Sequence, residues 1–456
     1  MYILSLIGYS GFPVFDTNKN RIPFSPWGQA DKTVLRKLAI NGFKTITQAE
    51  LEFGRVNLFI GANGSGKSNI LEAIGVLSAS LSRDITEAEL QRKGVRLSVP
   101  TLFKSAFKNQ ALKSNFGFEA AMDDDVKYNV RITAGEEYQS LRFFSEEILH
   151  DSVSYLGRSN RGIKLLGVEK ERADVSPERG LWDRFQEVID VPPELSAQLN
   201  TLAKFCIYAP QTSFLRGVEI ESLPVKPVGL LGGGLPQAAL TVLNQFHKSK
   251  DRESRDRVSL MREILGLIWM PGWASEFAVK QSLADQVSSQ VKTGNETLYF
   301  KDRFMRRKRD TLSAYDSSEG TLFLLFLAVV LLHAEAPKIF ALDNVDNALN
   351  PSATRAFLEK LIAVTCEKKF QASGIGPQQV FLTSHNPTSL DAFDLFNEEQ
   401  RIFVVSREPR TGFTKIERLQ PRPGMMPEEW IEIARGKNLS EMWISGLIPN
   451  ALGSSL

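Results

Sequence analysis

The feature that most constrains this chain is an eight-residue loop, GANGSGKS, at residues 61–68. The apolar residues 56–60 (VNLFI) predict a strand before it, and residues 69–82 show helical apolar spacing after it. The loop matches the pattern G-x-x-x-x-G-K-[ST] in full, in the strand–loop–helix context that this pattern requires. A glycine-rich turn that binds nothing is the alternative, and the complete match argues against it.

The residues of this loop, called the phosphate loop below, suit a bound ATP with its Mg²⁺ ion. Its backbone N–H groups can turn inward around a phosphate, and the positive end of the following helix adds to that field. We expect Lys67 to reach the β- and γ-phosphate oxygens and Ser68 to ligate Mg²⁺. The expected nucleotide-binding residues are Gly61, Asn63, Gly64, Ser65, Gly66, Lys67, Ser68 and Asn69.

Composition indicates a large globular protein. The chain has 456 residues, of which 43% are hydrophobic and 24% charged, enough for one large domain or two to three smaller ones. Because 55 Lys and Arg nearly balance 53 Asp and Glu, any contact with nucleic acid must come from a local patch. Only Cys206 and Cys366 are present, far apart, which argues against a disulfide framework or a cysteine zinc site.

Neither of the two most apolar segments predicts a contact with a membrane. The apolar residues 1–15 lack a basic region and do not read as a signal peptide. The longest apolar run, residues 322–332, is much shorter than the roughly 20 residues that span a bilayer, so it predicts a buried core helix. We expect a cytoplasmic protein with no membrane contact.

A second hydrophobic strand, residues 338–343 (KIFALD), ends in an acid. A phosphate loop of this kind needs a carboxylate on a neighbouring strand to hold the metal, directly or through water. Asp343 is therefore the expected partner of Ser68 in the metal site. An ordinary capping aspartate at a strand end is the alternative.

Two further features follow in a set order. Residues 316–321 (DSSEGT) form a serine–glycine turn before the apolar run, and His385 follows the predicted strand 379–383 in TSHNP. Taken alone, such a turn could be only a helix cap, and a lone histidine is usually structural. Strands alternating with helices in this part of the chain indicate an α/β sheet with parallel core strands.

This order of motifs resembles the ABC-type ATPases of the RecF, SMC and OLD group. The resemblance implies an α/β fold, namely an ABC-type P-loop NTPase head with a mixed sheet and a helical insertion, or lid, before the serine–glycine turn. In that family this turn of one subunit closes on the γ-phosphate held by another. Ser318, Glu319 and Gly320 would then form a signature acting in trans, in a homodimer or higher homo-oligomer, and His385 would be the switch histidine.

The main departure from the family lies directly after Asp343. ABC-type ATPases usually carry a glutamate there that polarises the attacking water, whereas this chain has Asn344. An amide cannot take a proton, and losing a general base typically costs roughly 10²- to 10⁴-fold in rate, so we expect slow hydrolysis. Asp346 could substitute for the glutamate or could cap a helix. Residues Phe43 and Lys44 also resemble an early turn that approaches the nucleotide in SMC-like proteins.

The phrases LDNVDNALNP, LTSHNP and LSEMWISGLIP look like the compact ATPases of bacterial anti-phage systems, such as PtuA of Septu and AriA of PARIS. OLD-family nucleases carry a nuclease domain after the ATPase, but only 71 residues follow His385 here. We therefore expect a separate effector protein, a nuclease or toxin, that this chain scaffolds or restrains. The alternatives are a RecF-like DNA-repair ATPase and a metabolic kinase, and the turn and histidine argue against the kinase.

The densest positive run in the chain lies at residues 301–309. It could follow a phosphate backbone, and a solvated hairpin tip is an equal alternative. Its candidate nucleic-acid contacts are Arg303, Arg306, Arg307, Lys308 and Arg309.

The expected division of the chain places an N-terminal extension at 1–32, a first ATPase lobe at 33–150, a variable helical insertion at 151–297, a second lobe at 298–410 and a C-terminal helical segment at 411–456. Within these we expect a hairpin at 116–132, a mobile loop at 151–178, helices at 193–205, 235–248, 257–268 and 351–364, a strand at 401–406, and an amphipathic helix at 428–443 that either docks a partner or packs on the core.

Overall fold

The computed structural model describes residues 3–5, 35–108, 110–134, 140–167, 175–246, 252–281, 287, 290–291 and 294–448. The chain forms two compact units. The larger holds the described residues of 31–209, 337–367 and 377–456, and the smaller holds those of 1–30, 210–336 and 368–376. Most of the predicted extension 1–32 and the last eight residues lie outside the described part.

A six-stranded sheet forms the centre of the larger unit. Its order is β10-β14-β15-β4-β16-β17, and every neighbouring pair is parallel except β16 with β17. The predicted α/β class with a mixed sheet is confirmed. All five residues of β4 are buried, as its continuous apolar run predicts for a central parallel strand. The strands are β4 (Val56–Ile60), β10 (Ile207–Tyr208), β14 (Ile339–Leu342), β15 (Gln379–Ser384), β16 (Gln400–Arg407) and β17 (Thr414–Leu419).

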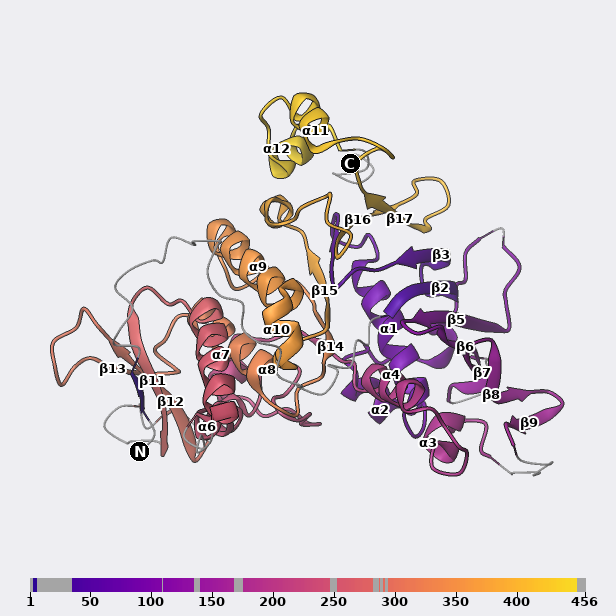
Figure 1. Ribbon diagram of the computed structural model, residues 1–456, viewed down its shortest axis with the longest axis horizontal. Helices are drawn as coiled ribbons and strands as arrows, with labels where there is room; N and C mark the ends of the chain where they lie inside the picture. The colour runs from indigo at the N-terminus through magenta and orange to yellow at the C-terminus, as the bar shows by residue number, and fades with distance from the viewer. Residues whose placement is uncertain are drawn as a thin grey trace. The chain divides into compact units, whose positions relative to one another are not determined.

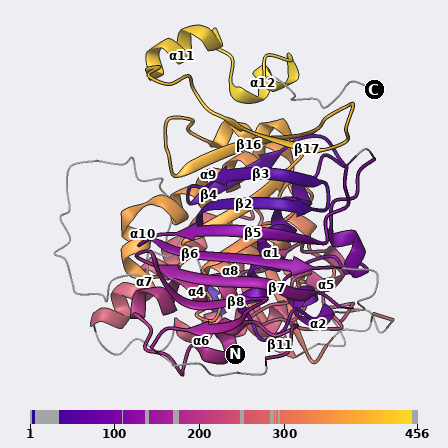
Figure 2. The ribbon, with the colours of Figure 1, turned by 90° about the vertical axis from the view of Figure 1, so that its right-hand side faces the viewer.

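A seven-stranded antiparallel sheet completes the larger unit, in the order β3-β2-β5-β6-β7-β8-β9. Figure 2 shows its strands β3, β2, β5, β6 and β7 side by side. The predicted hairpin is β5 with β6, which pair in register from Asn115↔Thr133 to Ala121↔Lys127. The strands are β2 (Leu35–Phe43), β3 (Ile46–Glu52), β5 (Asn115–Met122), β6 (Val126–Thr133), β7 (Arg142–His150), β8 (Val153–Ser159) and β9 (Gly162–Leu165).

The strands β8 and β9 correct two predictions. The mobile loop at 151–178 and the helical insertion beginning at 151 are wrong for these residues, which extend the antiparallel sheet beyond β7. Backbone hydrogen bonds hold these residues in the sheet although their sequence has few buried apolar positions. Leu156 is the one buried residue of β8. β9 is the edge strand of this sheet and β8 lies next to it, and their burial patterns show little of the alternation that marks a strand in a sequence.

The long helix α1 (Lys67–Leu81) lies in the core shared by both sheets. One apolar cluster joins Ile74 of α1, Tyr128 of the antiparallel sheet and Phe381 of the parallel sheet. Nearly every residue of α1 is buried, so its start, which bears the phosphate loop, is fixed on all sides. Helix α9 (Pro351–Cys366) contacts the parallel sheet at β4.

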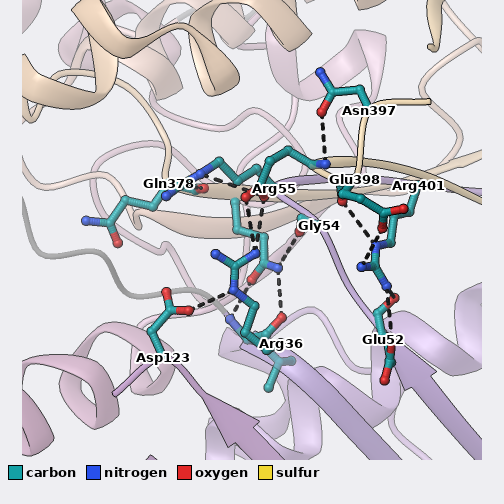
Figure 3. A network of polar contacts seen from close by, with 12 residues as sticks. Arg36, Glu52, Gly54, Arg55, Asp123, Gln378, Asn397, Glu398 and Arg401 are labelled. Atoms are coloured by element: carbon teal, nitrogen blue, oxygen red, sulfur yellow. Dashed lines mark hydrogen bonds and ion pairs between the residues drawn. The ribbon is translucent and has the colours of Figure 1, made fainter. Parts of the chain in front are cut away.

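Charged side chains fasten the two sheets to each other (Figure 3). Arg36, at the start of β2, donates to Asp123 (2.7 Å) and to Glu399 beside β16 (3.2 Å). Arg401 on β16 donates to the carbonyl of Glu52 on β3 at 2.8 Å. These contacts fix the antiparallel sheet against β16 of the parallel one.

The smaller unit combines helices with a four-stranded antiparallel sheet of order β1-β11-β12-β13 (Figure 1). Every residue of α8 (Glu319–Leu332) from Thr321 onward is buried, which confirms the predicted core helix. The sheet shows that the predicted insertion is not purely helical. The elements are β1 (Ile3–Ser5), α5 (Thr212–Leu215), α6 (Leu235–Gln245), α7 (Arg252–Ile268), β11 (Ala274–Gln281), β12 (Glu296–Asp302), β13 (Thr311–Ser313) and α10 (Lys368–Ser373).

The expected amphipathic helix at 428–443 is instead two short helices, α11 (Pro427–Ala434) and α12 (Leu439–Ile444). Arg435 and Gly436, both with positive φ (50° and 73°), end the first helix. Trp443 is 3% exposed, and Ser440 donates to Asp391 from its backbone and its hydroxyl, so α12 belongs to the core.

The remaining short helices of the larger unit are α2 (Glu87–Arg92), η1 (Pro100–Phe103), α3 (Leu181–Phe185), α4 (Pro193–Ala203) and η2 (Pro387–Ala392). Among the described residues, no helix has both the length and the apolar character needed to cross a bilayer.

Candidate nucleotide-binding site

The phosphate loop leaves the carboxyl end of β4 between two parallel neighbours, β15 and β16. Gly64 and Gly66 take positive φ values of 76° and 110°, which glycine adopts without strain. A Cβ at Gly61 would lie 2.0 Å from the carbonyl oxygen of Val405, and one at Gly66 would lie 2.3 Å from Oγ1 of Thr414. The packing therefore excludes any side chain at these two positions.

Lys67, the first residue of α1, turns back over the loop. Its Nζ donates to the carbonyls of Gly61 (2.8 Å) and Ala62 (3.0 Å). Burial lowers the pKa of this amine, and the carboxylates of Asp343 and Asp346 act against that effect. A buried cation among backbone carbonyls fits an anionic ligand, which would satisfy the charge far better than neutral carbonyls do.

Ser68 and Asp343 meet at the end of β14. The Ser68 hydroxyl donates to both carboxylate oxygens of Asp343, at 3.2 and 3.1 Å. Thr383 on β15 donates to Oδ1 of Asp343 at 2.5 Å, which fixes the carboxylate in place. Hydroxyl and carboxylate oxygens are the ligands that Mg²⁺ prefers, so this pair fits a magnesium ion that would neutralise phosphate charge.

Asn344 adopts a left-handed conformation with φ of 55°. Its backbone N–H donates to Oγ1 of Thr383 at 2.8 Å, so the turn after β14 is fixed by the same threonine that holds Asp343. Asparagine tolerates this conformation better than most residues. Its amide side chain has no capacity to take a proton from water.

Asp346 lies under the loop that follows β15. Its Oδ2 accepts hydrogen bonds from the backbone N–H groups of His385 (3.3 Å) and Asn386 (3.0 Å), and Nδ1 of His385 lies 3.2 Å away. Its Oδ1 is buried and has no hydrogen-bond partner in the described part of the chain. The helix-cap alternative is wrong for α9, which Asn350 caps. The side chain of His385 is 47% exposed.

The two asparagines predicted to bind nucleotide differ in their exposure to solvent. Asn63 is exposed on the loop, while Asn69 is buried on α1. The Asn69 side chain donates to Thr45 at 2.7 Å and accepts from Arg96 at 3.2 Å. Asn69 thus links the start of α1 to Thr45 in the β2–β3 turn. The Thr45 hydroxyl in turn contacts the hydroxyl of Thr414 at 2.6 Å.

Sequence reasoning missed a charged cluster one turn into α1. Glu72 is buried, and its carboxylate binds both Lys44, in the β2–β3 turn, and Arg96. Burial lowers the pKa of Lys44, with Glu72 acting against it. The signal available in the sequence was the one acid of α1, placed among apolar neighbours. Glu72, Arg96, Thr383 and Thr414 are the supporting residues that the motifs did not indicate.

The expected signature belongs to the smaller unit. Ser318 is the N-cap of α8, where its hydroxyl accepts from the backbone N–H of Thr321 at 3.3 Å. Ser318 and Glu319 are exposed and Gly320 is partly exposed. The helix-cap role is therefore present, and the role in trans stays a prediction.

Known proteins resemble this chain over most of its length. A family profile described as "AAA domain, putative AbiEii toxin, Type IV TA system" matches residues 56–391. The DNA replication and repair protein RecF of Shewanella baltica (strain OS155) is 25% identical over 395 residues, covering 81% of this chain and 99% of that protein. RecF of Magnetococcus marinus is 50% identical over 62 residues, 13% of this chain and 16% of that protein.

Two solved structures are also similar. The SMC head domain from Thermotoga maritima is 14% identical with a TM-score of 0.39, covering 85% of this chain and 99% of that one. The recombination mediator protein RecF of the RecFOR pathway is 12% identical with a TM-score of 0.34, covering 82% and 96%. Since the family profile spans well over half of the residues, the chain belongs to this family of AAA domains, as an ABC-type ATPase that resembles RecF.

Proposed function

We propose that this chain binds ATP with Mg²⁺, assembles through it into a homodimer or higher homo-oligomer, and restrains a separate effector protein in anti-phage defence. The observation that carries the nucleotide part is the convergence of the buried Lys67 amine with the Ser68–Asp343 oxygen pair at one strand end. A cation for phosphate oxygens, at the start of α1, thus lies next to hard ligands for a metal, one on α1 and one at the end of β14.

Slow hydrolysis follows from the residues around the expected water. Asn344 replaces the usual glutamate, and its left-handed backbone is fixed by Thr383. One buried oxygen of Asp346 has no partner among the residues that the structure describes, so Asp346 is our candidate for orienting or deprotonating the water. An ATPase that keeps its nucleotide for long periods suits a scaffold or sensor better than a motor.

The assembly and effector parts rest on resemblance. Ser318 presents a hydroxyl and a helix N-terminus at the surface of the smaller unit, which suits contact with an anion on another subunit. The effector, a nuclease or toxin, is inferred from the likeness to anti-phage ATPases. The family description itself names a toxin of a toxin–antitoxin system, which supports a role in defence.

ATP affinity and assembly state test this proposal together. We expect Lys67→Ala to weaken ATP binding, measured by calorimetry, by about 10- to 100-fold, because a charge-assisted contact to phosphate is lost. The exposed Lys37→Ala is the matched control and should bind ATP normally. Light scattering after size exclusion should show an ATP-dependent oligomer that Lys67→Ala does not form. A monomer with and without ATP would overturn the assembly part.

A DNA-dependent ATPase is the second candidate. The RecF of Shewanella baltica, a DNA replication and repair protein, aligns over 81% of this chain, which favours it. In that case duplex DNA should stimulate phosphate release severalfold. Two findings would favour the first proposal, in which the chain restrains an effector. One is an ATPase rate that DNA does not change, and the other is an effector gene next to the gene of this chain.

A further inference from the structure

The loop between β12 and β13 is an ordered turn at the edge of the smaller unit's sheet (Figure 1). The backbone N–H of Asp302 donates to the carbonyl of Asp310 at 2.7 Å, which closes the base of the loop. Phe304 N–H donates to Oδ1 of Asp302 at 2.8 Å, and Arg309 N–H donates to the carbonyl of Arg306 at 2.9 Å. These bonds hold the backbone of the loop in one ordered turn.

Five cations gather on this loop, and no described carboxylate pairs with them. We call residues 303–309 the basic tip. By contrast Lys301, on β12 just before it, pairs with Glu276 at 2.9 Å. The two flanking acids, Asp302 and Asp310, leave a local excess of about three positive charges, although the whole chain carries only +2. The exposed cations are Arg303, Arg306, Arg307, Lys308 and Arg309.

Two exposed apolar side chains lie among these charges. Phe304 is 75% exposed and Met305 is 49% exposed. The guanidinium of Arg303 lies 4.8 Å from the centroid of the Phe304 ring, a cation–π contact that orients the ring. An exposed aromatic ring with arginines around it offers a stacking surface next to phosphate-binding groups.

We propose that the basic tip binds single-stranded nucleic acid, with phosphates on its arginines and a base stacked on Phe304. Four of the five cations are arginine, whose planar fork suits phosphate oxygens better than the lysine ammonium does. A duplex keeps its bases stacked internally and gives Phe304 no partner. An anionic membrane surface would call for more apolar side chains than Phe304 and Met305. This activity goes beyond the proposed function and does not use the nucleotide site.

Charge reversal tests the phosphate contacts. Anisotropy of a labelled 20-nucleotide single strand should show that Arg306→Glu with Arg307→Glu weakens binding by at least tenfold and lowers its salt dependence. The matched control reverses two exposed cations of the larger unit, Arg435→Glu with Lys437→Glu, and should stay within about twofold. Equal losses in both variants would mean that only total charge matters, which overturns the proposal.

Stacking is tested separately. Phe304→Ala should weaken binding by about 5- to 100-fold, and the neighbouring Met305→Ala by much less. Repeating the measurement in Lys67→Ala without ATP should give the wild-type affinity, so a failure of the nucleotide proposal leaves this result interpretable. Equal binding of a duplex, a silent Phe304→Ala, or binding to phosphatidylserine vesicles but not to the oligonucleotide would each overturn the proposal.

Discussion

Nδ1 of His385 lies 3.2 Å from Oδ2 of Asp346, and the same oxygen accepts the backbone N–H of His385. The residue expected to sense the γ-phosphate is thus bound to Asp346, our candidate for the role of the missing glutamate. The loop after β15 is therefore tied to the segment after β14 through one carboxylate. If His385 senses the γ-phosphate and Asp346 orients the water, as proposed, this contact would couple the two roles.

Asp346→Asn should separate the two roles of this carboxylate. The amide oxygen can still accept from the backbone of His385, so the loop should stay folded and ATP should still bind. Proton acceptance is lost, so phosphate release should fall by about 10²-fold or more if Asp346 is the base. Parallel measurement of ATP affinity is the control. Unchanged turnover would show that another group activates the water.

Asn344→Asp should raise the rate of hydrolysis. Aspartate tolerates the left-handed φ of 55° nearly as well as asparagine, so a carboxylate enters without distorting the turn. Glutamate is a poorer test, because the strained backbone would cost on the order of 1 kcal/mol. Single-turnover phosphate release should increase at least severalfold. A rate equal to the wild type would place the water out of reach of this residue.

The sequence predicted the elements of the nucleotide site that depend on local spacing. A full phosphate loop between a strand and a helix sets the position of Lys67, and a hydrophobic strand ending in Asp343 must lie in the same sheet. Parallel pairing then brings Ser68 and Asp343 together, because carboxyl ends of parallel strands share an edge.

Contacts between distant segments could not be read from spacing. Glu72 binds Lys44 and Arg96 from two other elements, and nothing in the local pattern of α1 names those partners. The last two strands of the antiparallel sheet, β8 and β9, were missed because pairing with a neighbour, rather than apolar alternation, holds them in the sheet. The single amphipathic helix predicted at 428–443 is wrong because the chain turns at Arg435 and Gly436 and forms two short helices there.

Ser318→Asp should test the role of the signature in trans without loosening α8. Aspartate is as good an N-cap as serine, so the helix keeps its cap. Its negative charge would repel a γ-phosphate, so ATP-dependent assembly should weaken by at least tenfold in light scattering. Ser318→Asn is the matched control, because asparagine has the shape of aspartate without its charge and is also a good N-cap. This variant should assemble. Normal assembly of Ser318→Asp would contradict contact between this residue and phosphate.

The buried Glu146 should make stability depend on pH. Burial raises the pKa of this carboxyl to about 7, with Arg158 and the hydrogen bonds from Leu181 and Tyr128 acting against it.

Between about pH 4.5 and 7 the folded Glu146 keeps a proton that the unfolded chain releases, so the free energy of unfolding should fall as pH rises, by on the order of 3 kcal/mol. Glutamine carries no charge at any pH, so Glu146→Gln should remove this loss of stability. The melting temperature of the variant minus that of the wild type should therefore be larger at pH 8 than at pH 5. Glu147→Gln, which removes the carboxylate of the next residue on β7, is the control. A difference for Glu146→Gln that is equal at both pH values would mean that Arg158 keeps the carboxylate ionised in the folded protein.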